Sequence, residues 1–156
     1  MPNHYKVIPS QKGYYFLTDH KNKYFFYFLD SGSLYARYKS FRDNIYNFIF
    51  ELEEGEMISD KKVSETISHA LLRFFANEQN ILTFTCESID GKHKSRHKLF
   101  HKWFCEYNTI GLIKYDYVVT TQEMEIYNSV MFLESHPHKE KIIRAFQKVC
   151  MEINIG

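Results

Sequence analysis

The chain has 156 residues, of which 44% are hydrophobic and 25% are charged. This length is enough to bury the core of one domain, and we expect a single domain over residues 1–156. A net charge of +1 excludes a general attraction to nucleic acid or anionic membranes. Three widely spaced cysteines, no apolar leader and no long apolar run predict a cytoplasmic protein without a membrane span.

The first half of the chain predicts three strands. Residues 14–18 and 23–29 are rich in Tyr and Phe, and the polar residues 19–22 between them suit a hairpin. Residues 44–53 alternate with period two, as a strand with one wetter face does. The turn-rich basic stretch between the second and third strands is either a long loop or contains a short strand.

The second half predicts a helix, a strand, a helix, a hairpin and a final helix. These elements cover residues 59–77, 81–86, the stretch from the Asp90-Gly91 turn to 107, 112–119 with 125–133, and 137–153. Ser59 or Asp60 can cap the first helix, and apolar residues recur at helical spacing along it. The closing strands, joined by Thr-Thr-Gln, suit a hairpin.

This order, β-β-β-α-β-α-β-β-α, predicts an α+β fold with a single mixed, mostly antiparallel sheet and three helices. A strand, a helix and another strand in succession favour a parallel pair between 44–53 and 81–86. The sheet is therefore expected to break near Glu51 and Cys86. Ligands often bind at such breaks in mixed sheets.

The element order over residues 13–133 is similar to that of GNAT-type N-acetyltransferases. Leu99-Phe100 and Trp103-Phe104 fall where that family often has Leu-Tyr and Gly-Phe pairs. The resemblance implies a glycine-rich loop for the coenzyme A pyrophosphate and a tyrosine as general acid. Here the matching loop, 53–60, has one glycine and four acids, and Phe100 replaces the tyrosine. We therefore expect no acetyl-CoA-dependent activity and no cofactor.

The sequence also resembles an uncharacterised family of small bacterial proteins. The similarity is carried by the run Cys86 to Gly91, by Arg96, and by the pairs Leu99-Phe100 and Trp103-Phe104. This resemblance implies no particular chemistry.

A basic run begins the second helix. Lys92, Lys94, Arg96 and Lys98 are the predicted anion-binding residues, because cations at a helix start are unfavourable unless an anion offsets them. The alternative is a solvated helix face balanced by the acidic turn at 51–60. Arg96 falls in the apolar sector of the helix and needs a partner, for which Asp90 is the predicted ion pair and Glu87 a second candidate.

Other groups are candidates for chemistry or for partners. Glu51, Glu87 and Tyr107 are the catalytic candidates if the sheet break holds an active site. His93 and His97, at i and i+4, would supply two ligands to a metal, although no metal site is expected. The apolar stripe of the last helix either completes the core or forms a homodimer face.

We therefore expect an intracellular binding or interaction domain whose partner is a protein or an anionic ligand, and not a membrane. One alternative is an acyltransferase or other small-molecule enzyme that uses the cleft at the sheet break. A second alternative is nucleic-acid binding through the basic helix at 92–102, with exposed aromatic rings for stacking.

Overall fold

A computed structural model describes residues 3–56, 58–87 and 93–155, and their side chains except those of 87, 93–96, 154 and 155. Its elements, in chain order, are β1 (Ile8–Pro9), β2 (Tyr14–Leu17), β3 (Lys23–Asp30), the 3₁₀ helices η1 (Gly32–Tyr35) and η2 (Arg42–Asn44), β4 (Ile45–Glu54), α1 (Lys61–Phe74), β5 (Ile81–Glu87), α2 (His93–Tyr107), β6 (Leu112–Thr120), β7 (Glu125–Leu133) and α3 (Lys139–Ile155).

The strands form one seven-stranded sheet in the order β1-β2-β3-β4-β5-β7-β6. Only the β4–β5 pair is parallel, and every other neighbouring pair is antiparallel. The α+β class, the mixed sheet with three helices and the parallel pair are therefore as predicted. The short β1 is an addition to the predicted order, and the basic stretch before β4 contains η1 and η2.

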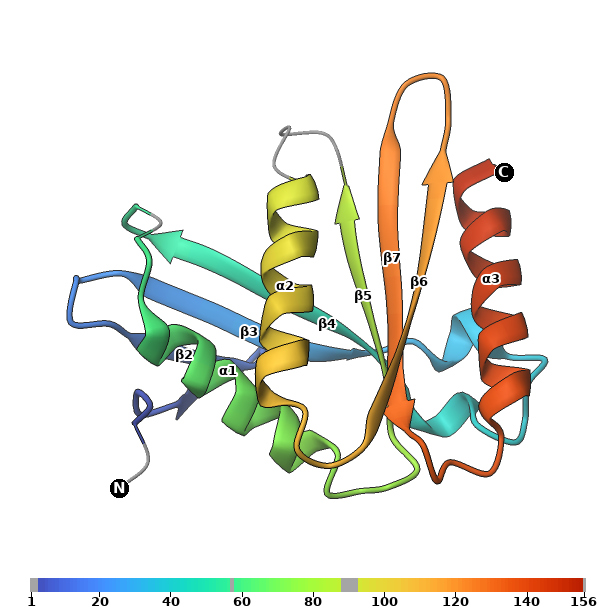
Figure 1. Ribbon diagram of the computed structural model, residues 1–156, viewed down its shortest axis with the longest axis horizontal. Coiled ribbons are helices and arrows are strands. Elements are labelled where there is room, and N and C mark those ends of the chain that lie inside the picture. Colours follow the sequence, from blue (N-terminus) through green and yellow to red (C-terminus); the bar gives the residue numbers. More distant parts are fainter. Residues whose placement is uncertain (1–2, 57, 88–92, 156) are drawn as a thin grey trace.

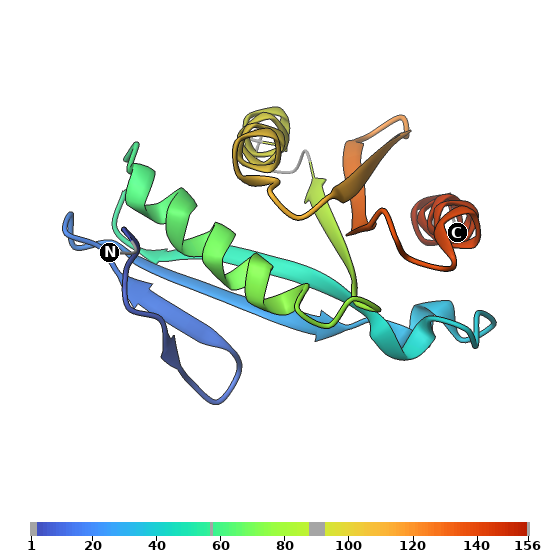
Figure 2. The same cartoon turned by 60° about the horizontal axis from the view of Figure 1, so that its bottom comes forward.

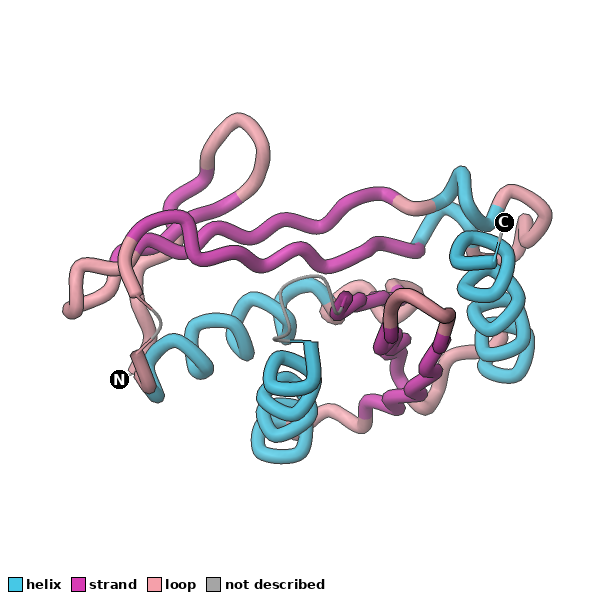
Figure 3. Tube along the Cα trace, turned by 90° about the horizontal axis from the view of Figure 1, so that it is seen from above, coloured by secondary structure: helices cyan, strands magenta, loops and turns pink. Residues whose placement is uncertain are grey.

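The antiparallel half follows from the alternation of large side chains along its strands. In β3, Tyr24 and Phe26 are buried, whereas Phe25 and Tyr27 point to the other face and are half-buried. Thr18 and Asn22 close the β2–β3 turn, because the Asn22 N–H donates to Thr18 Oγ1 at 3.1 Å. The pattern gives one face that packs against helices and one that none of the described helices covers (Figure 3).

The helices are divided between the two faces of the sheet. In α1, Phe74 stacks on Phe28 of β3 at 4.6 Å between ring centroids. In α2, Phe100 stacks on Phe84 of β5 at 4.1 Å, on the same face of the sheet. Figures 2 and 3 show α3 on the opposite face, across β5, β7 and β6 from α2.

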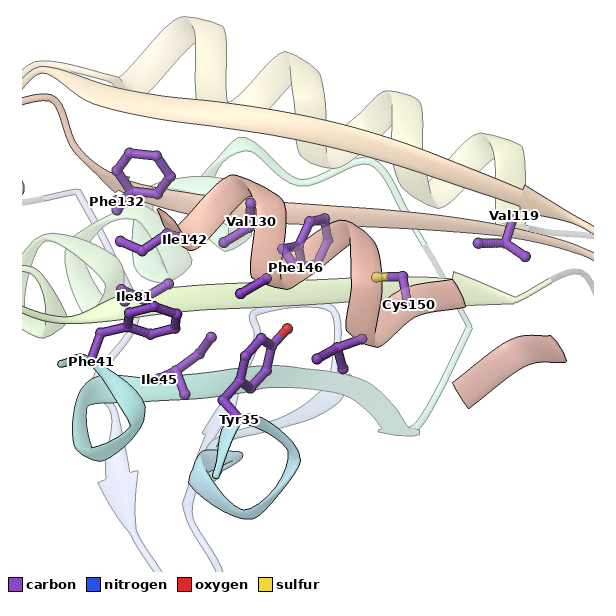
Figure 4. Packing of buried hydrophobic residues seen from close by; sticks show 12 residues of the cluster. Tyr35, Phe41, Ile45, Ile81, Val119, Val130, Phe132, Ile142, Phe146 and Cys150 are labelled. Carbon is purple, nitrogen blue, oxygen red and sulfur yellow. The ribbon is translucent and has the colours of Figure 1, made fainter. Parts of the chain in front are cut away.

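Two apolar cores result, one on each face. The first lies beneath α1 and α2 and is dominated by aromatic rings, including Phe16, Phe26 and Phe48. The second lies beneath α3, where Ile142 and Phe146 pack against β7 and against Phe41 from the segment before η2 (Figure 4). The apolar stripe predicted for the last helix is thus buried in this second core.

Candidate functional site

The sheet breaks where the two parallel strands part. β4 and β5 pair only at Ile45–Asn47 with Ile81–Thr83, and beyond this they diverge (Figure 1). The break therefore lies where the sequence predicted it. Glu51 is exposed on β4, and the backbone of Glu87 pairs with Ile126 at the far end of β5.

The crevice between α1 and α2 is apolar and narrow. Its volume is about 40 Å³, room for only a few water molecules. Its lining includes Leu71 of α1 and Trp103 and Phe104 of α2. At its rim the Tyr107 hydroxyl lies 3.0 Å from Ser64 Oγ. Tyr107 thus belongs to a helix–helix contact near the end of α2. The side chain of Glu87 lies outside the described residues, so a catalytic role for Glu51, Glu87 and Tyr107 stays a prediction.

The start of α1 is occupied by the protein's own groups. Asp60 Oδ1 accepts a hydrogen bond from the Lys62 N–H at 3.0 Å, and Asp60 Oδ2 accepts one from the Tyr5 hydroxyl at 2.6 Å. Burial, helped by this hydrogen bond, raises the pKa of Tyr5 to about 12. A carboxylate therefore already fills the position at which a helix N-terminus would otherwise attract a phosphate.

The first two residues after β4 are also held by local contacts. Gly55 has a φ of 104°, in the left-handed region, and ends β4. The Asn22 side chain packs against Gly55 and donates to the Glu56 carbonyl oxygen at 2.7 Å. The single glycine of this loop thus makes a turn.

The predicted basic site on α2 is only partly described. Lys98 is exposed. Lys92 and Asp90 lie outside the described residues, as do the side chains of Lys94 and Arg96, so the proposed ion pair between Asp90 and Arg96 stays a prediction.

His97 and His101 of α2 lie close to side chains of β6 and belong to a polar cluster that the sequence did not predict. This α2–β6 cluster consists of His97, His101, Lys114, Asp116 and Ser129. Asp116 Oδ1 accepts from Lys114 Nζ at 2.5 Å and from Ser129 Oγ at 2.6 Å, and its Oδ2 lies 3.9 Å from His97 Nε2. His101 Nδ1 lies 3.1 Å from Lys114 Nζ. One feature of the sequence indicates part of this cluster. Lys114 and Asp116 stand at alternate positions of β6, and such positions point to the same face of a strand.

The order of groups in this cluster argues against catalysis by a serine nucleophile. Ser129 donates to Asp116 rather than to a histidine, and a carboxylate already paired with Lys114 is a weak base for a hydroxyl proton. Burial raises the pKa of Asp116, but hydrogen bonds from Lys114 and Ser129 outweigh it and the net shift is downward. Burial lowers the pKa of His97, although Asp116 acts in the opposite direction. The cluster is best described as a paired, partly buried charge network.

Metal ligands do not gather in the part of the chain that the structure describes. There, no three His, Cys, Asp or Glu side chains lie close enough together to hold an ion. His97 contacts Asp116, and the side chain of its predicted partner, His93, lies outside the described residues.

A larger groove lies beside α3, with a volume of about 620 Å³. One wall is the first half of α3, and Tyr38, from the segment between η1 and η2, contributes to the other. Four cations and one carboxylate line it, namely Lys139, Lys141, Arg144, Lys148 and Glu140. We define these residues with Tyr38, His136 and His138 as the α3 groove. The sequence indicates this cationic wall through Lys141, Arg144 and Lys148, because residues at i, i+3 and i+7 lie on one face of a helix.

Comparison with known proteins places the chain in a family. A model described as "Family of unknown function (DUF6169)" matches residues 59–148, more than half of the chain, and the protein belongs to this family. The match runs from the start of α1 into α3 and so includes most of the α3 groove. No curated protein and no solved structure matches the chain. Among the described residues, no helix has the length and apolar character needed to cross a membrane.

Proposed function

We propose that the protein is an anion-binding domain whose ligand occupies the α3 groove. The observation that carries this proposal is the charge of the groove, where four cations face one carboxylate in a molecule whose net charge is only +1. The groove also falls in the size range of small-molecule sites, whereas the crevice between α1 and α2 does not.

The only carboxylate of the groove does little to cancel these charges. Glu140 lies 3.9 Å from Arg144, but both side chains are more than four-fifths exposed. Pairs as exposed as this contribute at most about 1 kcal/mol, so an incoming anion can displace Glu140 at small cost. The cations thus remain available to a ligand.

The element order matches that of GNAT-type N-acetyltransferases only loosely. Two features argue against acetyl-CoA chemistry within it. Asp60 places a negative charge where the pyrophosphate would lie, and Phe100 has no proton to donate and is fixed against Phe84. An acyltransferase that uses Glu51, Glu87 and Tyr107 is less well supported, because the Tyr107 hydroxyl already lies within hydrogen-bond distance of Ser64 Oγ.

The test is calorimetric titration with inorganic tripolyphosphate at low ionic strength. Arg144→Glu and Lys148→Glu should each weaken binding roughly tenfold, because each removes a charge-assisted contact. The matched control is Lys98→Glu, which makes the same change in net charge on the basic face of α2.

Three outcomes separate the alternatives. Loss of binding with the α3 variants alone supports the proposal. If Lys98→Glu abolishes binding and the α3 variants do not, the anion site is on α2 and the proposal is wrong. Absence of tripolyphosphate binding to the unmodified protein also overturns it.

A further inference from the structure

β6 is the edge strand of the sheet and has one unpaired side. It is paired with β7 without a bulge from Leu112 to Thr120, and it stands last in the strand order. Just outside this range, the Gly111 carbonyl oxygen and the Thr121 N–H bind the residues on either side of β7. Odd-numbered residues therefore point their N–H and C=O groups toward β7, and even-numbered residues point theirs outward.

Two of the outward positions are open to solvent through their main chain. The side chain of Lys114 is only 2% exposed, yet the residue as a whole is half-buried, so its exposed atoms belong to the backbone. Asp116 is exposed as a residue, although its side chain is only 35% exposed. Among the described residues, none forms a hydrogen bond with the outward backbone groups of Lys114, Asp116 or Val118. This edge therefore offers unpaired donors and acceptors to another strand.

The first residue of the edge is already closed. The Asn108 side chain accepts a hydrogen bond from the Leu112 N–H and donates one to the Leu112 carbonyl oxygen, both at 2.9 Å. Asn108 thus takes the place of a neighbouring strand at Leu112, and a partner strand can form hydrogen bonds only from Lys114 onward. At the other end of the edge, the Val118 side chain is 43% exposed.

The charges on β6 select one way of pairing with a strand of the same sequence. An inward-pointing charge on an edge strand usually prevents pairing, because it meets a like charge or an apolar side chain. A two-fold antiparallel pair centred on Tyr115 avoids both, since Lys114 then lies opposite the partner's Asp116. A centre at Lys114 or at Asp116 would place like charges opposite each other, and a centre at Tyr117 would place Asp116 opposite a valine.

The same register matches the apolar side chains. On the face that α2 covers, Leu112 lies opposite the partner's Val118, and on the other face Ile113 lies opposite the partner's Tyr117.

We propose that β6 is a homodimer interface at which two copies of the chain join their sheets edge to edge. The main chains of Lys114 and Asp116 exchange hydrogen bonds with those of the partner's Asp116 and the partner's Lys114. Each Asp116 then lies between its own Lys114, with Nζ at 2.5 Å, and the partner's Lys114. This inference does not depend on the anion site of the α3 groove.

The first test combines sedimentation of the unmodified protein with amide exchange. An interface this small predicts a dissociation constant in the micromolar range. Where the dimer forms, the amides of Lys114 and Asp116 should exchange roughly tenfold more slowly than in the dilute monomer. The Val118 and Thr120 amides, which point outward beyond the paired residues, are the internal control and should exchange quickly in both states.

A disulfide trap tests the register. Only a pair centred on Tyr115 brings the two Tyr115 Cα atoms to about 4.5 Å, close enough for a disulfide. Tyr115→Cys should therefore cross-link under mild oxidation in a Cys105→Ser background, which removes the exposed native thiol. Tyr117→Cys replaces another half-buried tyrosine on the same face of β6 and, as the matched control, should not cross-link. Thermal unfolding checks that each variant folds.

Concentration-dependent protection of Lys114 and Asp116, with cross-linking at Tyr115 alone, supports the interface. A protein that sediments as a monomer at millimolar concentration overturns it. A dimer in which the amides of Lys114 and Asp116 stay fast also overturns it, because its interface then lies elsewhere. Cross-linking of Tyr117→Cys instead of Tyr115→Cys shows that the register is wrong. If Tyr115→Cys does not fold, amide exchange in the unmodified protein decides between these outcomes.

Discussion

At the scale of single residues, Asp60 shows how one side chain directs function away from a site that the fold would permit. Its two oxygens satisfy an orphan N–H of α1 and the Tyr5 hydroxyl, while Lys62 Nζ lies 4.5 Å from the centre of the Tyr5 ring. The same carboxylate that stabilises the helix start repels a phosphate from it.

Removal of this cap should destabilise the protein. Asp60→Ala leaves a helix N–H and the Tyr5 hydroxyl without their acceptor and should lower the free energy of unfolding by about 2 kcal/mol in urea denaturation. Asp60→Asn should restore most of the loss, since asparagine also caps helices. Asp43→Ala, at a highly exposed carboxylate, is the control. An Asp60→Ala variant as stable as the control would contradict this account.

Three histidines should make stability depend on pH. Burial lowers the pKa of His69, His97 and His136 from the ordinary value of 6.5, so the unfolded chain binds protons more tightly than the folded protein does. The stability that the three neutral histidines contribute to the fold is complete above pH 6.5. It is lost as the pH falls below this value. The melting temperature should therefore fall between about pH 7.5 and about pH 5.

Two variants test this prediction, one at a buried histidine and one at an exposed histidine. His136→Gln should flatten the pH dependence, whereas His20→Gln, in the exposed β2–β3 turn, should leave it unchanged. A melting temperature that rises on acidification would show that the sign is wrong.

At the scale of elements, local patterns in the sequence predicted much of the fold. Alternation specified β3 and β4, helical spacing specified α1 and α3, and the strand–helix–strand order specified the parallel pair. The α3 groove and the α2–β6 cluster were missed because each depends on how distant segments pack. Nothing local shows that Tyr38 and Arg144 line one groove, or that His97 comes within 3.9 Å of Asp116. The homodimer through the last helix stays a prediction. The apolar stripe that was to form its interface packs in the core beneath α3.

The sheet break predicts a pattern of amide exchange along β4. From Phe48 to Glu54 the strand pairs with β3 on one edge, and among the described residues no strand pairs with its other edge. Every second amide of this stretch should therefore exchange quickly, while the amides of Ile45–Asn47, which lie between two strands, should exchange slowly. Hydrogen exchange followed by NMR measures this directly. Uniform protection along β4 would show that its second edge is covered.

At the scale of the whole molecule, the near-zero net charge conceals an uneven distribution. Acids gather around the end of β4 and the start of α1, and cations gather along the first half of α3. The acidic region lies where the resemblance to acetyltransferases would place a cofactor. The basic region lies on the opposite face of the sheet (Figure 3). We therefore expect this protein to bind anions at α3 and not at the start of α1.

The most direct test of this claim is an NMR titration of the labelled protein with inorganic tripolyphosphate, followed by backbone amide shifts. The shifted amides should cluster at 36–42 and 136–148, the two walls of the α3 groove. Shifts confined to 58–64 at the start of α1, or to 93–102 in the basic part of α2, would contradict it.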